Sequence, residues 1–245
     1  MTAAADVPGT GAEHRPEHHH EHRDVTGGWL RPAVFGVMDG LVSNTALVAG
    51  VAGGGASADT VLLAGLAGLA AGAFSMATGE YVSVASQSEL TRAEIEIEKR
   101  EIARVPAAEE AELAEIYQSR GVDAATAAEV ARQLSRDPEQ VWRVHAREEL
   151  GVDPDDLPSP WTAAGSSFAA FTVGALVPVL PYLLGADSLL VTVVLALVAL
   201  FVAGALVSRF TDRSALYSGS RQLLLGGAAT ALTYAVGSLV GTGVG

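Results

Sequence analysis

Long stretches without any charged side chain recur along the chain. They cover residues 40–58, 60–79, 157–186, 188–208 and 222–245. Each is close to the ~20 residues that a helix needs to cross a lipid bilayer, and none shows the one-sided apolar stripe of a soluble amphipathic helix. The pattern predicts an all-α membrane protein with five transmembrane helices, at residues 33–53, 60–84, 161–184, 188–208 and 221–243. Pro178 and Pro181 predict a kink in the third of these helices. Small residues on the second are expected to permit close helix contact; they are Gly65, Gly68 and Gly72.

The segment between the second and third predicted spans is polar. Residues 86–158 carry nine basic and eighteen acidic side chains. Proline, aspartate and glycine positions predict four helices in it: residues 86–104 continuing the second span, 106–119, 124–134, and a fourth that begins at Pro138 after an Asp137 cap and ends at Gly151. We therefore expect four regions: a tail (1–28), transmembrane helices one and two (29–85), a helical metal-binding domain (86–158) and transmembrane helices three to five (159–245).

The 15 Lys and Arg residues predict the orientation. All of them lie before the first span, in residues 86–158, or around the connection between spans four and five. The positive-inside rule then places the N-terminus and residues 86–158 in the cytoplasm and the C-terminus outside. The first 28 residues have no apolar core of a signal peptide and hold five of the six histidines. We expect a disordered tail there, and leave open whether it gathers metal or is simply solvated.

Composition excludes several classes of protein. A mean hydropathy of +0.32 with only 18% charged residues is too apolar for a soluble globule. The absence of cysteine excludes a disulfide framework, a thiolate metal site and a thiol nucleophile. A net charge of −13 argues against a nucleic-acid partner, because phosphate binding requires surplus Lys and Arg.

Acidic side chains in the polar segment recur at helical spacing. Glu94, Glu98 and Glu101 share one helix face, Glu109, Glu112 and Glu115 repeat on the next helix, and His145 precedes Glu149 by four residues. Like charges at this spacing destabilise a helix by a few tenths of a kcal/mol per pair. Spacing alone fits either a divalent-cation site or a solvated acidic face.

Polar residues also occur inside the first two predicted spans. Asp39 is followed one turn later by Ser43 and Asn44, and the second span contains Met76 and Glu80. A charge at the bilayer centre costs ~2.5–3.5 kcal/mol on insertion scales, so such residues usually serve a function. Carboxylate oxygens suit divalent ions, and a thioether favours Fe²⁺ or another transition metal over Mg²⁺ or Ca²⁺. These five residues are the predicted ion pathway, in which Asp39 carries a proton when no metal is bound.

Three segments resemble the vacuolar iron transporter family of membrane proteins. They are GVMDGLVSNTALVAGV (36–51), AGAFSMATGEYVSVASQSE (71–89) and REELG (147–151), and the resemblance extends from about Trp29 to the C-terminus. It implies a homodimer with the ion path between protomers and exchange of Fe²⁺, sometimes Mn²⁺, for protons. It also implies metal contacts at Asp39, Met76, Glu98, Glu101, Glu109, Glu112 and Glu149. Better-known members carry a methionine where His145 aligns and an acid where this chain has Ala146; an imidazole would still suit Fe²⁺, Mn²⁺ or Zn²⁺.

The expected function is therefore that of a secondary transporter, and not of an enzyme, which moves Fe²⁺ or Mn²⁺ out of the cytoplasm in exchange for protons. We expect no prosthetic group and no catalytic residue. Fourteen arginines against one lysine suggest a bacterial member in the plasma membrane. Two alternatives are a membrane-anchored metal sensor or buffer and a ferritin-like iron oxidase. The oxidase requires Glu-x-x-His pairs on core helices, and Glu17–His20 in the tail is the one such pair.

Overall fold

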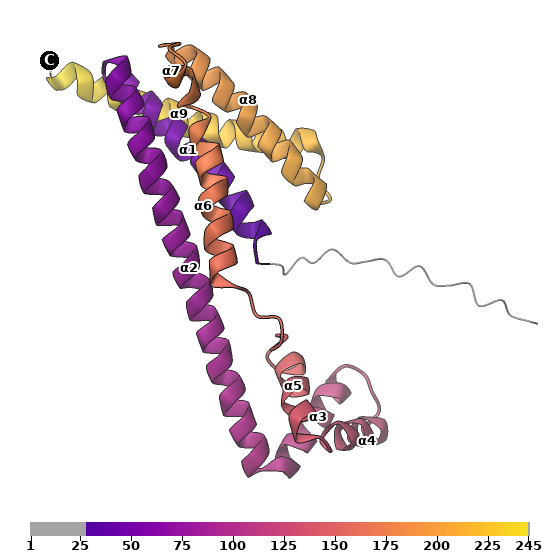
Figure 1. Ribbon diagram of the computed structural model, residues 1–245. Coiled ribbons are helices and arrows are strands. Elements are labelled where there is room, and N and C mark those ends of the chain that lie inside the picture. The colour runs from indigo at the N-terminus through magenta and orange to yellow at the C-terminus, as the bar shows by residue number, and fades with distance from the viewer. Residues whose placement is uncertain (1–27, 245) are drawn as a thin grey trace, which may run out of the picture.

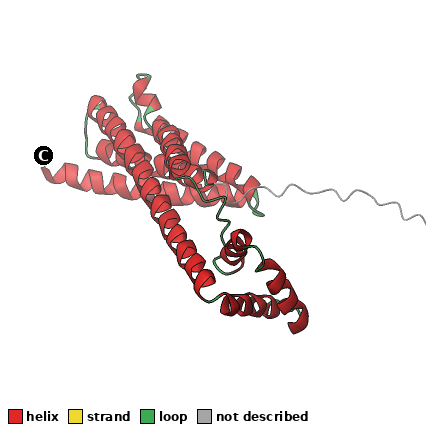
Figure 2. Cartoon of the chain, turned by 60° about the horizontal axis from the view of Figure 1, so that its bottom comes forward, coloured by secondary structure: helices red, strands yellow, loops and turns green. Residues whose placement is uncertain are grey.

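The structure is a computed structural model, which describes residues 28–244. The predicted tail of residues 1–28 lies, apart from Gly28, outside the described residues. Within residues 28–244 the only regular secondary structure is helical (Figures 1 and 2). The α-helices are α1 (Leu30–Gly53), α2 (Ala58–Arg104), α3 (Pro106–Ser119), α4 (Ala124–Leu134), α5 (Pro138–Glu148), α6 (Pro160–Leu176), α7 (Leu180–Leu183), α8 (Leu189–Val207) and α9 (Ala215–Val244). A short 3₁₀ helix, η1 (Ser208–Phe210), follows α8.

Helix α2 runs the length of the molecule (Figure 1). Its 47 residues extend about 70 Å at 1.5 Å per residue. The Ser57 side chain caps its first turn by accepting from the Thr60 backbone N–H. No glycine or proline follows Gly79 until the helix ends at Val105, directly before Pro106. The predicted continuation of the second span into residues 86–104 is therefore confirmed.

The apolar helices form a closely packed bundle. Helix α6 packs against α1 and α2, and α9 packs against α1 and α8. Glycines allow the backbones to approach: a Cβ on Gly237 of α9 would overlap the carbonyl group of Gly50 of α1, and one on Gly72 of α2 would overlap the Phe171 ring of α6. Gly65 and Gly68 likewise face side chains of neighbouring helices. The small residues of α2 therefore permit close helix contact, as the sequence predicts.

The third predicted span is divided into two helices. Helix α6 ends at Leu176 and α7 begins at Leu180, because Pro178 and Pro181 supply no backbone N–H to continue the helical hydrogen bonds. The kink predicted at Pro178 and Pro181 is in fact a break between two helices, so the prediction of one kinked helix over residues 161–184 is wrong. Four described helices are long and apolar enough to cross a membrane: α1, α2, α8 with η1, and α9. Helix α6, with 17 residues, is shorter than these.

The bundle helices expose large apolar side chains on their outer surfaces. Leu190 of α8 is 73% exposed, and Leu224 and Leu232 of α9 are each 67% exposed. Apolar area exposed on this scale is stable in a lipid environment or against a partner protein and not in water. The bundle is therefore that of a membrane protein.

Helices α3, α4 and α5 form a small separate core beside the end of α2 that is remote from α7 (Figure 1). Leu113 and Ala114 of α3 are buried there against Ala131 of α4. Asp123 and Asp137 cap α4 and α5 by accepting backbone N–H groups at 3.1 and 2.9 Å. The predicted bounds of α3 and α4 are confirmed, and α5 ends at Glu148, slightly before the predicted stop.

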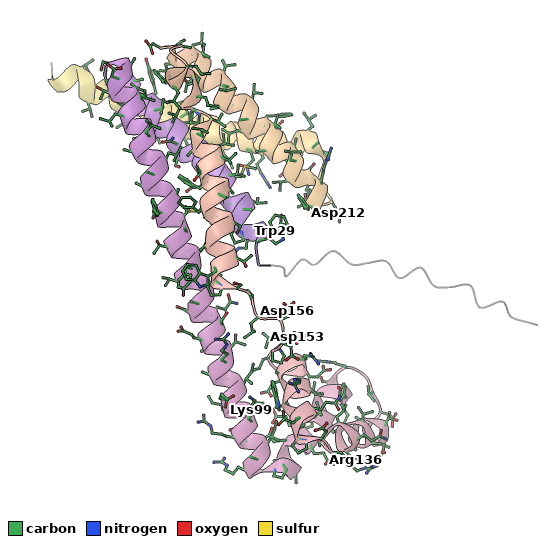
Figure 3. The ribbon with its side chains drawn as sticks, viewed as in Figure 1. Trp29, Lys99, Arg136, Asp153, Asp156 and Asp212 are labelled. Carbon is green, nitrogen blue, oxygen red and sulfur yellow. The ribbon has the colours of Figure 1, made fainter. Side chains whose placement is uncertain are left out.

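One end of the bundle lies nearer to the small domain formed by α3, α4 and α5 (Figure 1). Figure 3 shows Trp29, which precedes α1, and Asp212, between α8 and α9, at the bundle end nearer to α3–α5. Helix α6 also begins on that side, after the connection that carries Asp153 and Asp156 (Figure 3). The α1–α2 turn and α7 lie at the opposite end (Figure 1).

Candidate metal centre

Three helices bring two glutamates and one histidine to one point. Helix α2 supplies Glu98, α3 supplies Glu109, and α5 supplies His145. The chain turns at Val105 and Pro106, and α3 stays in contact with α2 beyond this turn. Helix α5 packs against both. The short turn brings Glu98 and Glu109 together, but the histidine comes from more than thirty residues further along the chain.

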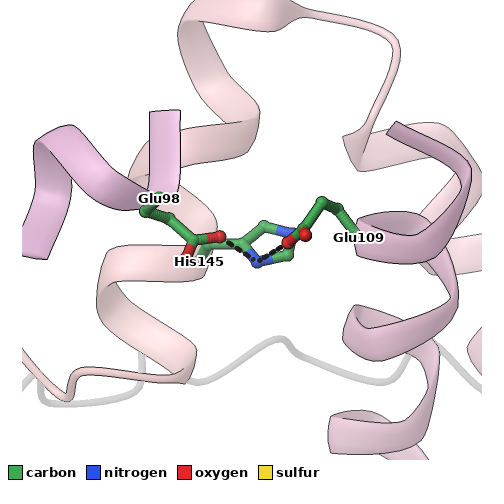
Figure 4. A group of neighbouring side chains, drawn as sticks. All are labelled: Glu98, Glu109 and His145. Atoms are coloured by element: carbon green, nitrogen blue, oxygen red, sulfur yellow. Dashed lines mark ion pairs between the residues drawn. The ribbon is translucent and has the colours of Figure 1, made fainter. Parts of the chain in front are cut away.

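The potential ligand atoms of these residues lie close together. One atom each from Glu98, Glu109 and His145 lies within 4.8 Å of the other two. The Nδ1 atom of His145 is 2.8 Å from Oε1 of Glu98 and 3.9 Å from Oε2 of Glu109 (Figure 4). Oε2 of Glu149, one turn beyond His145, is also 3.9 Å from Nδ1. Three carboxylates therefore converge on a single ring nitrogen.

The centre is buried and its polar atoms are poorly satisfied. The His145 side chain is 0% exposed, and those of Glu98 and Glu109 are each 8% exposed. Within the described part of the chain, both His145 ring nitrogens and Oε1 of Glu98 lack a hydrogen-bond partner, because the 2.8 Å contact is not aligned as a hydrogen bond. A buried polar group without a partner costs about 1–3 kcal/mol. A bound cation would satisfy Nδ1 of His145 and Oε1 of Glu98 together.

The remaining predicted glutamates surround this group electrostatically. Burial, followed by the negative charges of four nearby glutamates, raises the pKa of Glu98 from 4.5 to about 7. These four neighbours are Glu149, Glu109, Glu112 and Glu101. Burial also raises the pKa of Glu109, as does the charge of Glu112, while the charge of His145 opposes the rise. Near neutral pH Glu98 is thus protonated in part of the molecules, and a metal ion would displace this proton.

The structure separates the predicted metal ligands into an inner and an outer set. Glu98, Glu109 and His145 are buried, whereas Glu101 and Glu112 are exposed. Glu149 is exposed as well, with a side chain 36% exposed. Helical spacing alone treats Glu98 and Glu101 alike, because each follows an isoleucine by about one turn, Ile95 or Ile97, and only the structure shows that Ile95 is the buried one.

Asp39 and Ser43 lie on the outward face of α1, one of the helices of the apolar bundle. Asp39 is partly exposed, and Ser43, Phe35 and Leu47, spaced by four residues, are exposed. The Ser43 hydroxyl donates to the Asp39 backbone carbonyl at 2.6 Å. Among the described residues the Asp39 carboxylate has no ion-pair partner. This carboxylate is therefore available to an ion or to a second protein surface.

Asn44 and Met76 face the interior of the bundle. The Asn44 amide donates to the carbonyl oxygens of Gly65 in α2 at 3.1 Å and Ala175 in α6 at 2.7 Å. The Ala175 carbonyl is open because the α6 helix breaks just after it. Met76 packs against the apolar cluster formed by Ala73, Ala175 and Phe171. Asn44 thus links three helices, a role that its position in the sequence does not predict.

Glu80 lies near the end of the apolar part of α2. The next residue, Tyr81, packs its ring 4.8 Å from that of Trp161 at the start of α6. Tyr and Trp favour the interface between membrane and water. Of the five predicted pathway residues, the structure thus places Asp39 and Ser43 on the outer face, Asn44 and Met76 inside, and Glu80 at one end.

The fold and this centre define a helical membrane protein with a candidate metal site outside its apolar bundle. The sequence profile of the VIT family matches residues 30–238, and the chain belongs to this family. It is 34% identical over 227 residues to vacuolar iron transporter 1 of Arabidopsis thaliana, covering 91% of each chain. It is 40% identical over 222 residues to the vacuolar iron transporter of Acanthamoeba castellanii, covering 87% of this chain and 79% of the relative. Vacuolar iron transporter 1 of rice is 34% identical over 251 residues. All three relatives carry the name vacuolar iron transporter.

Proposed function

We propose that this protein is a secondary transporter that moves Fe²⁺, and also Mn²⁺, out of the cytoplasm in exchange for protons. The observation that carries the proposal is the buried group of Glu98, Glu109 and His145 at the end of a helix continuous with a membrane span. The relatives named above are iron transporters. A site that captures cations and is joined rigidly to the membrane bundle fits that activity.

We place five spans in the membrane, with α6 and α7 together forming the third. The pair extends over residues 160–183, which is long enough to cross a bilayer despite the break. Interfacial aromatic residues indicate where the bilayer ends: Trp29 is 53% exposed and Trp161 is 74% exposed. Residues 86–158 then lie in the cytoplasm, with Glu98 about 25 Å beyond Tyr81 along α2.

Asp39 is the proposed coupling residue in the membrane. It lies ten residues after Trp29 on α1, about 15 Å along the helix axis and therefore near the bilayer centre. Its carboxylate alternates between binding a cation and binding a proton, which links the two movements. Ser43, Met76 and Glu80 would line the same route, while Asn44 also holds the helices together.

The transporter is proposed to act as a homodimer. The face of α1 that bears Asp39 and Ser43 also exposes Phe35 and Leu47. A single protomer leaves this polar and apolar face uncovered, and a second copy would enclose it as a pathway. Cross-linking in mild detergent should trap a dimer, and an active protein that is only monomeric would contradict this assembly.

The cellular location is a separate proposal. The named relatives are called vacuolar, but the arginine-rich, lysine-poor composition leads us to place this chain in a bacterial plasma membrane. Transport out of the cytoplasm would then be efflux. Fractionation of the source cells tests the assignment, since recovery in an internal compartment would exclude it.

Flux in proteoliposomes tests the transport proposal. Purified protein is reconstituted with a pH gradient, and uptake of Fe²⁺, Mn²⁺, Co²⁺ and Zn²⁺ is measured with proton movement. Asp39→Asn keeps the side-chain size and removes the ionisable group, so we expect flux to be abolished, as in Asp39→Ala. Wild-type flux in Asp39→Asn would remove the coupling role. Metal binding without any flux in the wild type would favour a sensor or buffer, and metal-dependent oxygen consumption would favour an oxidase.

The metal centre is expected to capture ions and not to perform the crossing. Replacing four glutamates together by glutamine should weaken metal binding and slow transport at low metal, while transport at saturating metal persists. The four are Glu98, Glu101, Glu109 and Glu112. The matched control is Glu115→Gln, which removes an exposed charge from the same helix as Glu109. If the quadruple variant binds metal as the wild type does, the acids are only a solvated face.

A further inference from the structure

One atom distinguishes the metal centre from an ordinary acidic cluster. Every side chain that converges there is a carboxylate except His145, whose Nδ1 faces Glu98, Glu109 and Glu149. We propose that His145 is a direct nitrogen ligand that sets the ion preference of this centre, which selects divalent transition ions over Mg²⁺ and Ca²⁺. This inference rests on the proposed function, in which the centre binds the transported ion.

Donor chemistry gives the reason. Carboxylate oxygens hold Mg²⁺, Ca²⁺ and Mn²⁺, so a site built only from glutamates discriminates poorly among them. An imidazole nitrogen is a good ligand for Fe²⁺, Co²⁺, Ni²⁺ and Zn²⁺, and a poor one for Mg²⁺ and Ca²⁺. Affinity at a site with one nitrogen and several oxygens then rises from Mn²⁺ to Fe²⁺ and Co²⁺.

Packing holds the imidazole in place for this role. His145 is completely buried, and the next residue, Ala146, is 0% exposed as well. Helix α5 packs against α2 and α3, so the ring cannot turn out to solvent. The Nδ1 atom is buried and, among the described residues, has no hydrogen-bond partner. With the proton on Nε2, its lone pair is free for a cation between the ring and the two buried carboxylates, which Figure 4 shows around it.

Pulsed electron paramagnetic resonance of bound Mn²⁺ tests the ligand directly. The full-length protein in detergent is stripped of metal and loaded with one equivalent of Mn²⁺. We expect ¹⁴N modulation from a coordinated imidazole in the wild type and its loss in His145→Gln, which keeps a polar side chain of similar size. The tail holds the other five histidines, so a control variant replaces His14, His18, His19, His20 and His22 by Gln. That control should keep the modulation.

Selectivity is measured by titration calorimetry of the same proteins with Zn²⁺, Co²⁺ and Mg²⁺. In His145→Gln we expect the Zn²⁺ and Co²⁺ affinities to fall about tenfold or more, while the Mg²⁺ affinity changes little. Loss of a residue that only supports a metal ligand already lowers metal affinity by about tenfold, and loss of the ligand itself should lower it at least as much. Glu115→Gln should leave all three affinities unchanged.

The outcomes separate this inference from the function on which it rests. If the wild type binds Mn²⁺ without ¹⁴N modulation, and Glu98→Gln weakens that binding, the acidic centre stands and the role of His145 is refuted. An unchanged ratio of Zn²⁺ to Mg²⁺ affinity in His145→Gln refutes it as well. If the wild type binds no metal at this position, the capture site of the proposed function itself fails.

Discussion

Replacing Glu98, one of the two buried acids of the centre, should stabilise the metal-free protein while destroying its capacity to bind metal. Glu98→Gln keeps the side-chain shape and removes the charge. Glu98 is 6% exposed, and four glutamates act on it. In the metal-free state above neutral pH, its ionised form is buried among like charges. The native glutamate is therefore unfavourable for folding and useful only when a cation is bound.

The pKa of Glu98 provides the magnitude. Because its pKa rises from 4.5 to about 7 on folding, the folded protein holds the proton more tightly than the unfolded chain does. The stabilising contribution is fully present below pH 4.5 and is lost as the pH rises through 7. The full rise corresponds to about 3 kcal/mol. Glu101 and Glu112 are exposed and screened by water and salt, so we expect about 1–3 kcal/mol at pH 8.

Hydrogen exchange measured by mass spectrometry is the appropriate assay, because it reports the opening free energy of α3 and α5 within the full-length protein. At pH 8 with chelator, amides in these helices should exchange more slowly in Glu98→Gln than in the wild type. The difference should shrink towards pH 5. Saturating Mn²⁺ should slow exchange in the wild type only. Faster exchange in the metal-free variant at pH 8 would refute the reasoning, since it would mean that ionised Glu98 stabilises the fold.

Three further predictions follow from the same structure. Mn²⁺ affinity should fall roughly tenfold between pH 8 and pH 6, because the proton on Glu98 competes with the ion; calorimetry at the two pH values checks this. Asn44→Leu leaves the buried Ala175 carbonyl unpaired and should lower stability by about 1–3 kcal/mol in detergent melts, whereas Ser43→Ala should change it little. Gly237→Ala should lower the melting temperature because a Cβ there meets backbone, while Gly79→Ala, in open space, should not.

Local signals in the sequence determined the elements of this protein. The uncharged stretches indicate the apolar helices, and residues such as Pro106, Asp123 and Pro138 predict where α3, α4 and α5 begin. Pro178 likewise predicts an irregularity in the third span, although the structure has a break there and not a kink. These features depend on interactions within a few residues, namely caps, missing N–H groups and apolar length, so the sequence carries them directly.

The tertiary structure alone decided what the polar residues do. Helical spacing puts Glu98 and Glu101 in equivalent positions. Only the packing of α3 and α5 against α2 buries Glu98 and leaves Glu101 exposed. The sequence predicts Asn44 as a pathway residue. Its hydrogen bond to Ala175 depends on the break in α6, which leaves that carbonyl without a helical partner. In each case the partners are distant in sequence, and burial depends on how helices pack, which no local pattern records.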